Sequence, residues 1–229
     1  MASTVSPPAS PPGEASPLRG AVVPVTPFRQ NCLLLWDERT MRGTVVDPGE
    51  ASAVLQALEE LGVTAEKILL THGHLDHAAG AAELSETLRI PVEGPHEADR
   101  FLLDGLAASA AQYGFGGRPV TPNRWLSEGD TVEIAGRRFG VLHCPGHTPG
   151  HVVFHAEDGS LAIVGDVLFQ GSVGRTDFPY GDGPGLIRAI REKLFPLGDD
   201  VPFLCGHGAG GTLGEERRTN PYAGDRAAG

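Results

Sequence analysis

Apolar and polar positions recur along the chain in patterns that predict short strands and amphipathic helices. Between residues 51 and 61 the apolar side chains follow the spacing of a half-buried helix, and Gly62 marks its end. Further helices are predicted over 78–89, 101–113 and 185–194. Apolar runs bounded by turn residues predict strands over 21–28, 32–36, 44–47, 67–71, 131–135, 138–143, 151–155, 161–165 and 201–205.

The order of these elements predicts an α/β (α+β) architecture. Strands come first, and mixed strands and helices follow without a linker, so two sheets with helices on their outer faces are expected. Residues 1–17 are nearly all Pro, Ser and Ala and are expected to form a disordered tail, because they bury too little apolar area to offset the entropy of ordering. A frayed end is expected over 223–229, which leaves 18–222 as one folded domain.

Composition narrows the class of protein. A chain of 229 residues with 40% hydrophobic residues is long enough for one large domain with a real core. Its 18 basic and 29 acidic residues give a formal net charge of −11, and a field of that sign disfavours nucleic acid and anionic membranes as partners. The start of the chain lacks the features of a secretory signal. We therefore expect a cytoplasmic protein with no nucleic-acid, membrane or obligate protein partner.

The cysteines fit the same compartment. Cys32, Cys144 and Cys205 are odd in number and widely spaced, and no C-x-x-C pair occurs. A disulfide framework and a structural zinc knuckle are therefore not expected. Each cysteine lies in or beside an apolar stretch and is expected to be a small buried hydrophobic residue.

Potential metal ligands cluster directly after one predicted strand. The segment HGHLDH at residues 72–77 offers four of them within six positions. In an extended H-x-H the imidazoles of His72 and His74 lie on the same side, because side chains alternate along extended backbone. Asp76 and His77 then turn the other way as a helix begins. This arrangement suits two adjacent cations better than one.

Three more ligand-type side chains, His147, Asp166 and His207, follow other predicted strands. In α/β folds, ligand crevices form beyond the carboxyl ends of strands. An aspartate that closes a hydrophobic strand needs a partner, and a metal ion supplies one. For His151 a structural role and a substrate-facing role both remain open, and structural roles are expected for the other histidines, His96, His143 and His155.

Together these residues resemble a known family. The pattern H-x-H-x-D-H at 72–77, followed by the three later ligands, resembles the full ligand set of the metallo-β-lactamase-fold hydrolases. The segments GDVLF (165–169), SVGRTDFP (172–179), CGHG (205–208) and EERRTNP (215–221) are similar to the single-domain bacterial glyoxalase II-like (hydroxyacylglutathione hydrolase-like) branch. The GRTDF segment is shared with the related persulfide dioxygenases.

The resemblance implies a four-layer αββα sandwich, the metallo-β-lactamase fold, with a two-metal site in a cleft at one sheet edge. By this resemblance, one divalent metal ion would be bound by His72, His74 and His147. The other would be bound by Asp76, His77 and His207, and Asp166 would bridge the two ions. Zinc is the expected metal because imidazole and carboxylate ligands suit it, and iron and manganese suit the same ligands.

A mechanism follows from two such cations. They would lower the pKa of a shared water from about 15.7 toward roughly 7, and the bridging hydroxide, held at Asp76 and Asp166 as catalytic residues, would attack a carbonyl. A thiolate leaves without a strong general acid, whereas an amide nitrogen needs one. The expected activity is therefore that of a glyoxalase II-like thioesterase acting on a small-molecule S-acylglutathione, such as S-D-lactoylglutathione, to give D-lactate and glutathione.

Several alternatives stay open. A mononuclear-iron persulfide dioxygenase, a lactone hydrolase and an inactive metal-binding module are compatible with the same residues. Two-domain glyoxalase II enzymes carry a C-terminal helical extension whose basic residues bind the glutathione carboxylates, and few residues follow His207 here. The expected substrate contacts are Phe178 and the arginines Arg175, Arg217 and Arg218, for which structural salt bridges are the alternative role.

Overall fold

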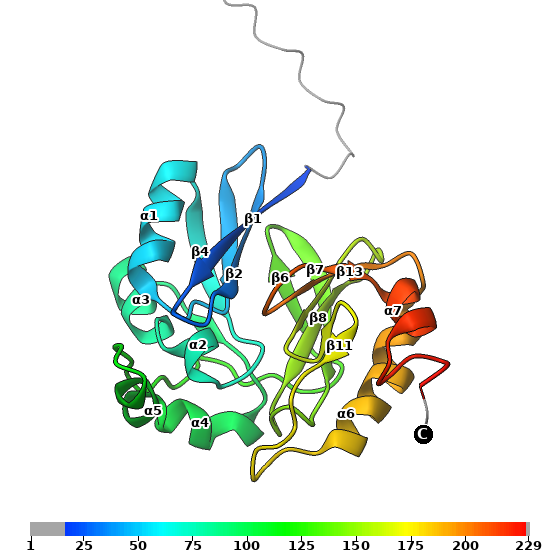
Figure 1. The fold of residues 1–229 in the computed structure, drawn as a ribbon. Coiled ribbons are helices and arrows are strands. Elements are labelled where there is room, and N and C mark those ends of the chain that lie inside the picture. The colour runs from blue at the N-terminus through cyan, green and yellow to red at the C-terminus, as the bar shows by residue number, and fades with distance from the viewer. Residues whose placement is uncertain (1–16, 228–229) are drawn as a thin grey trace, which may run out of the picture.

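The apolar runs of the first half of the chain form a five-stranded sheet (Figure 1). The structure, a computed structural model, describes residues 17–227. The first sheet has the order β1-β2-β3-β4-β5, in which β1, β2 and β3 pair antiparallel and β4 and β5 join in parallel. Its strands are β1 (Leu18–Val25), β2 (Gln30–Asp37), β3 (Arg42–Val46), β4 (Thr64–Leu69) and β5 (Val92–Glu93).

The second half forms a six-stranded sheet of order β13-β12-β9-β8-β7-β6, in which only β12 and β9 pair in parallel. A small antiparallel hairpin of β10 and β11 follows β9. The strands are β6 (Thr131–Ile134), β7 (Arg137–His143), β8 (Val152–Ala156), β9 (Ala162–Gly165), β10 (Leu168–Phe169), β11 (Ser172–Val173), β12 (Pro202–Cys205) and β13 (Gly211–Thr212).

Helices cover the outer face of each sheet (Figure 1). On the first sheet these are α1 (Ala51–Leu61) and α3 (Ala81–Leu88), with α2 (Leu75–Ala78), the 3₁₀ turn η1 (Glu97–Asp99), α4 (Arg100–Asp104) and α5 (Leu106–Gln112) toward one end. On the second sheet these are α6 (Gly183–Ala189), its continuation through η2 (Ile190–Leu194) and η3 (Phe195–Leu197), and α7 (Leu213–Thr219). Of the helices within residues 17–227, none combines the length and the apolar character needed to cross a bilayer.

Alternation along the strands builds three apolar layers. In β2, Leu33 and Leu35 face the second sheet, whereas Cys32 and Leu34 face the helices, as the period of two requires. The layer between the sheets also contains Phe139, Val141, Phe154 and Ile163 from the second sheet. Fully burying one such side chain contributes about 1.5–3 kcal/mol. The four-layer αββα sandwich expected from the sequence is thereby confirmed.

The predicted helix over 51–61 is confirmed as α1, and Gly62 ends it in the left-handed region at a φ of 66°. The predicted helix over 78–89 is found as α3, and Ala78 belongs instead to the separate short helix α2. Between the two helices, the backbone N–H of Gly80 donates to the carbonyl of Pro48 rather than to a helical carbonyl. The short elements β5, β10, β11, β13 and α7 were not predicted.

Both ends of the expected domain can be compared with the structure. The expected tail lies outside the described residues, apart from Pro17. The expected frayed end differs from what is found, because Ala223 is buried and its carbonyl accepts a hydrogen bond of 2.9 Å from Nε of Arg191. The N–H of Asp225 donates to the carbonyl of Arg217. Order therefore continues past residue 222, and residues 228–229 lie outside the described part.

Candidate metal centre

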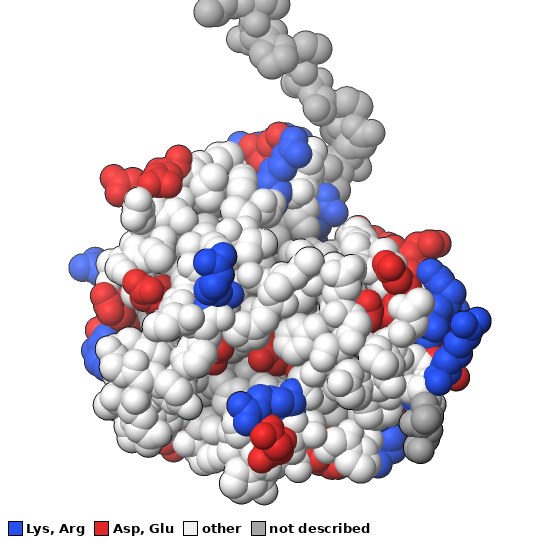
Figure 2. Space-filling model, viewed as in Figure 1, with Lys and Arg blue, Asp and Glu red and all other residues white. Residues whose placement is uncertain are grey.

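The strand ends of both sheets bring seven ligand-type side chains to one edge of the sandwich. Four of them follow β4 and the others follow β7, β9 and β12: His72, His74, Asp76 and His77; then His147, Asp166 and His207. Figure 2 shows a hollow near the centre of this face with acidic atoms at its floor. It corresponds to a cavity of roughly 630 Å³ whose lining includes Asp76, Asp166 and His207.

His72, His74 and His147 form a three-histidine group. Nδ1 of His74 lies 3.1 Å from Nε2 of His72 and 2.9 Å from Nε2 of His147. Burial lowers the pKa of all three imidazoles, that of His74 to about 3, so that they are neutral near pH 7. Three neutral imidazoles whose nitrogens converge are the donor set of a zinc-type site.

The outer nitrogens of this group show which nitrogen is free to bind. Nδ1 of His147 lies 2.8 Å from the carbonyl of Arg175 and must donate to it. Nε2 of His74 lies 2.9 Å from the hydroxyl of Tyr180, and Nδ1 of His72 lies 3.0 Å from the hydroxyl of Thr71. With the protons on these outer atoms, the three inner nitrogens keep their lone pairs for a cation.

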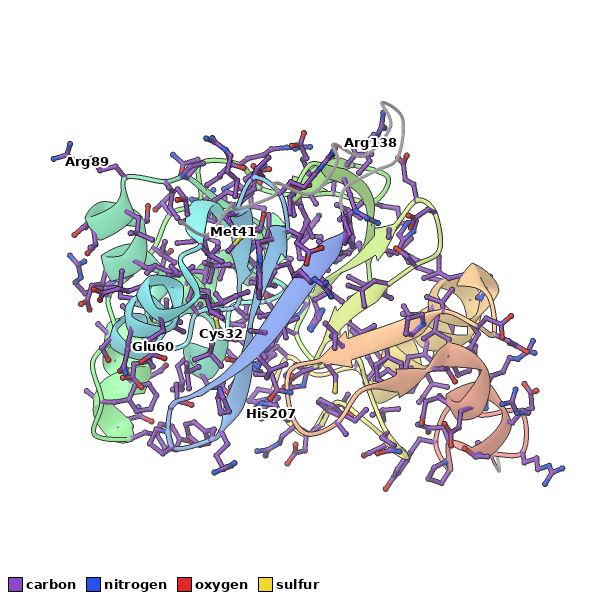
Figure 3. All side chains as sticks on the ribbon, turned by 90° about the horizontal axis from the view of Figure 1, so that it is seen from above. Cys32, Met41, Glu60, Arg89, Arg138 and His207 are labelled. Atoms are coloured by element: carbon purple, nitrogen blue, oxygen red, sulfur yellow. The ribbon has the colours of Figure 1, made fainter. Side chains whose placement is uncertain are left out.

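Asp76, His77 and His207 form an aspartate–histidine group beside the first. Oδ2 of Asp76 lies 3.2 Å from Nε2 of His207 and 3.8 Å from Nε2 of His77. Among the described residues, the buried Nε2 of His77 finds no hydrogen-bond partner. His207 lies beyond the end of β12 and close to the β1–β2 hairpin (Figure 3), where the N–H of Asn31 donates to the carbonyl of Gly206.

Asp166 lies between the two groups. Its Oδ1 is 3.3 Å from Nε2 of His77, and its Oδ2 is 3.5 Å from Nε2 of His147. Burial opposes its ionised form, but His77 above all lowers the pKa of Asp166 far below the usual range. Within residues 17–227 its buried Oδ1 has no hydrogen-bond donor. A buried carboxylate beside unpaired imidazole nitrogens is costly without a cation, so this donor set fits divalent metal ions.

Two carboxylates that the sequence analysis did not single out support these groups. Asp47 accepts the N–H and the hydroxyl of Thr71 and lies 2.9 Å from Nδ1 of His77. It follows the apolar strand β3, so the strand-end pattern that pointed to Asp166 could also have pointed to Asp47. Asp99 lies in a helical turn and carried no such signal. Burial raises the pKa of Asp99 to about 6, although hydrogen bonds from Thr148 and neighbouring backbone amides oppose that shift.

His151, left open by the sequence, contacts the centre from behind. Its ring is fully buried and stacks on His72 with a centroid separation of 4.6 Å. Its Nε2 accepts the backbone N–H of Asp166 at 3.0 Å. His151 therefore orients one ligand and packs on another, which is a structural role.

The expected substrate contacts separate into two sets. Phe178 and Arg175 line the cavity, and the guanidinium of Arg175 lies 4.5 Å from the Phe178 ring centre. The same guanidinium also forms a two-point ion pair with Asp177, with N–O distances of 2.7 and 2.8 Å. Arg217 and Arg218 do not line it, because both lie on α7, where their guanidinium groups face Asp199. The aromatic side chains of Phe28, Tyr113 and Tyr180, which were not predicted from the sequence, also line the cavity.

Comparison with known proteins agrees with this geometry. A family model described as Metallo-beta-lactamase superfamily matches residues 25–207. The chain is 44% identical over 204 residues to hydroxyacylglutathione hydrolase GloC of Haemophilus influenzae, a match that covers 88% of this chain and 96% of that protein.

Solved structures give the same picture. The BLEG-1 B3 metallo-beta-lactamase has a TM-score of 0.81 and 32% identity, with 90% of this chain and 99% of that one covered. The structure of TTHA1623 in a di-iron-bound form has a TM-score of 0.76 and 36% identity, with 88% and 99% covered. The chain belongs to the metallo-β-lactamase superfamily.

Proposed function

We propose that this metal-dependent hydrolase cleaves thioesters of the S-acylglutathione type, with S-D-lactoylglutathione as the representative substrate. The similarity to hydroxyacylglutathione hydrolase GloC supports this substrate class. The proposed products are D-lactate and glutathione, and the proposed partner is the small-molecule substrate alone.

The proposed cofactors are two divalent metal ions. One is assigned to the three-histidine group and the other to the aspartate–histidine group, with Asp166 shared between them. Bound there, the ions would lower the pKa of a water molecule and polarise the substrate carbonyl. Zinc is our first choice for its match to imidazole and carboxylate ligands, and the di-iron form of TTHA1623 makes iron the first alternative.

One observation carries the choice of a thioester: the acids at the cavity floor are ionised. Burial opposes ionisation of Asp76, but His77 and His207 bring its pKa below the usual value, and the pKa of Asp166 is lower still. Near pH 7 both carboxylates are therefore ionised and can accept hydrogen bonds, but neither carries a proton to give to a leaving group. Hydroxyl groups among the described lining residues are ordinarily weak acids, and burial raises the pKa of Tyr180 further; the others belong to Ser109, Tyr113 and Ser172.

The leaving group must therefore depart without a strong proton donor. A thiol has a parent pKa near 8.5, so a thiolate can leave unprotonated, whereas an amide nitrogen cannot. The role proposed for Asp76 and Asp166 is to hold the nucleophilic water and accept its hydrogen bond. The imidazoles of the centre are proposed as metal ligands, so they are not proposed as proton donors to the leaving group.

The cavity walls suit an acylated thiol larger than a lactoyl group alone. Apolar side chains of Leu102, Leu106 and Phe169 line a space of roughly 630 Å³, within the usual range for small-molecule sites. Arg175 is the one Lys or Arg side chain among the described residues that line it. We propose that its guanidinium contacts a carboxylate of the thiol carrier and that Phe178 packs against the substrate.

A direct assay tests the proposal. Protein loaded with zinc, iron or manganese is given S-D-lactoylglutathione, and released thiol is measured beside a lactone and a β-lactam, with oxygen uptake recorded on glutathione persulfide. Thiol release well above that of a His74→Ala/Asp166→Ala variant is expected. A rate equal to that of the variant rejects the thioester substrate. Faster turnover of the lactone, the β-lactam or the persulfide assigns the site to that chemistry instead.

A cytoplasmic location is also proposed. It is supported by three cysteines that are buried and free, as is usual in a reducing compartment.

A further inference from the structure

Asp99 is a buried carboxylate that contacts two separate loops of the proposed metal centre. Its side chain lies at the end of η1 and is shielded from solvent. Oδ2 accepts the backbone N–H of Gly73 at 2.8 Å and the hydroxyl of Thr148 at 2.7 Å. Oδ1 accepts the N–H of Gly150 at 2.5 Å. All three donors come from loops rather than from regular elements.

These donors are neighbours of the three-histidine group. Gly73 separates His72 from His74, and Thr148 follows His147 directly. One carboxylate therefore connects the loop after β4 with the loop after β7, and those two loops supply the whole group. The aspartate–histidine group has no such bond to Asp99, and its His77 is oriented by Asp47 instead.

The packing around Asp99 leaves little freedom. A Cβ atom on Gly73 would lie 2.8 Å from Cβ of Leu102, and one on Gly150 would lie 2.7 Å from Cγ of Asp99. Real Cβ atoms do not approach other heavy atoms so closely, so both loops meet the carboxylate through glycine. The carbonyl of Gly150 also accepts the N–H of His96, which fixes the loop after β7 from a second side.

Burial of the Asp99 carboxylate at this place is energetically unfavourable. Within residues 17–227 it forms no ion pair with Lys or Arg, so only the three loop donors compensate its loss of hydration. Removing a carboxylate from water is unfavourable, and such hydrogen bonds offset only a part of the lost hydration. The side chain fixes the relative position of the loop after β4 and the loop after β7.

We propose that Asp99 is a positioning residue that sets the spacing of His72, His74 and His147, and thereby the metal affinity of the three-histidine group alone. This inference rests on the metal centre of the proposed function and concerns a residue that contacts neither metal nor substrate. Positioning of ligands through hydrogen-bonded neighbours is typically worth about 10- to 100-fold in metal affinity.

The test is a zinc titration of the full chain, stripped of metal, against a chromophoric chelator. Two variants of Asp99 are compared, Asp99→Ala and Asp99→Asn, together with Thr148→Val. Asp99→Ala removes all three acceptor bonds. In Asp99→Asn the amide NH₂ group faces the backbone N–H of Gly73 or that of Gly150, whichever way it is turned, and cannot accept a hydrogen bond from it. We therefore expect a smaller loss of zinc affinity than in Asp99→Ala. Thr148→Val removes one donor and leaves the carboxylate in place.

A second background identifies which group has changed. His207→Ala removes a ligand of the aspartate–histidine group and leaves the three-histidine group as the remaining site. In this background, Asp99→Ala should weaken zinc binding about 10- to 100-fold, with Asp99→Asn intermediate and Thr148→Val mildest. In the otherwise unchanged chain, one affinity should fall and the other should stay within about twofold.

Glu216→Gln is the matched control. Glu216 is also a buried carboxylate that accepts a backbone N–H, that of Gly171 at 2.9 Å, but Gly171 adjoins no proposed ligand. Both zinc affinities should stay within about twofold of those of the parent chain. Circular dichroism and the thermal midpoint confirm that each variant is folded, and if Asp99→Ala does not fold, Asp99→Asn and Thr148→Val decide.

Each outcome has a distinct meaning. Loss confined to the three-histidine group supports the proposal. Equal weakening of both sites, or unchanged affinities in folded Asp99→Asn and Thr148→Val, overturns it. A parent chain that takes up no metal overturns the metal centre and this inference together. A parent chain that binds two ions but cleaves no thioester overturns only the proposed substrate and leaves the titration decisive.

Discussion

Oδ2 of Asp47 lies 2.9 Å from Nδ1 of His77, in a part of the protein from which solvent is excluded. The same oxygen accepts the hydroxyl of Thr71, whose own oxygen lies 3.0 Å from Nδ1 of His72. Asp47 therefore directs one imidazole of each ligand group, the first by contact and the second through a threonine.

Replacing Asp47 by asparagine should weaken metal binding at both groups. An amide cannot accept the same set of hydrogen bonds, so the proton of His77 loses its fixed place on Nδ1. We expect about 10- to 100-fold lower affinity, as for other residues that orient ligands. Chelator competition measures it. Asp130→Asn, which alters a surface carboxylate bound to the N–H of Ser127, should leave the affinity unchanged, and an equal loss there would contradict the assignment.

Metal should stabilise the folded protein. Cations at the centre would relieve the unpaired buried atoms of His77 and Asp166, which the unfolded chain exposes to water. At a free zinc concentration about 100 times the dissociation constant, the free energy of unfolding should rise by about 2.7 kcal/mol per site. Thermal unfolding with and without chelator checks this. Asp166→Ala should respond to zinc much less, and a full response in that variant would argue against a shared aspartate.

Arg175 and Arg218 make a matched pair for the substrate contact. Arg175 lines the cavity, whereas Arg218 is exposed on α7 near Asp199. Arg175→Gln should raise KM for an anionic thioester several-fold with little change in kcat, and added salt should narrow the difference, because an exposed charge contact is screened. Arg218→Gln should leave both constants unchanged. Steady-state kinetics on a charged and an uncharged thioester would separate the two.

The buried thiols make stability fall in alkali. Burial raises the pKa of Cys144 to about 12 and that of Cys205 to about 11. In the unfolded chain both thiols ionise at about pH 8.5. Below that pH the thiols do not change the free energy of unfolding. Above it, only the unfolded chain loses the thiol protons, which stabilises the unfolded state and lowers the free energy of unfolding. Each thiol should lower the free energy of unfolding by about 1.4 kcal/mol per pH unit between its two pKa values.

Urea unfolding at several pH values above neutrality measures this slope. Cys144→Ala should make the decrease in the free energy of unfolding with pH less steep, by the amount that corresponds to one proton. This holds whatever the variant does to stability at neutral pH. Native protein should also resist alkylation by iodoacetamide until it is unfolded. Rapid alkylation of folded protein, or an unchanged slope in Cys144→Ala, would contradict the burial of this thiol.

Local pattern was sufficient for the layers of the fold. The spacing of Val54 and Leu58 indicated a half-buried helix, and alternation of buried residues along the apolar runs yields strands with two differently covered faces. The seven ligand-type residues were also found from their places after strands. β7, β9 and β12 run in the same direction, so their carboxyl ends lie along one edge of the second sheet. Asp47 obeys the same rule and was treated only as the end of a strand.

Other features depend on packing between distant segments. Phe28 in the β1–β2 turn and Tyr113 after α5 meet with ring centres 5.1 Å apart at the cavity wall, and no local spacing announces that contact. The positions of Arg217 and Arg218 follow from how α7 lies on the second sheet near Asp199. Asp99 gained its partners only because the loops after β4 and β7 converge on it.

Neither sheet supplies all the donor atoms of the centre. Four of the seven side chains follow β4 of the first sheet, and the last along the chain, His207, follows β12 of the second. During synthesis on the ribosome, a nascent chain that has not yet extended past β12 possesses every donor of the three-histidine group but only part of the other. The aspartate–histidine group is consequently completed last, when His207 follows β12, whereas the three-histidine group has all its donors earlier in synthesis.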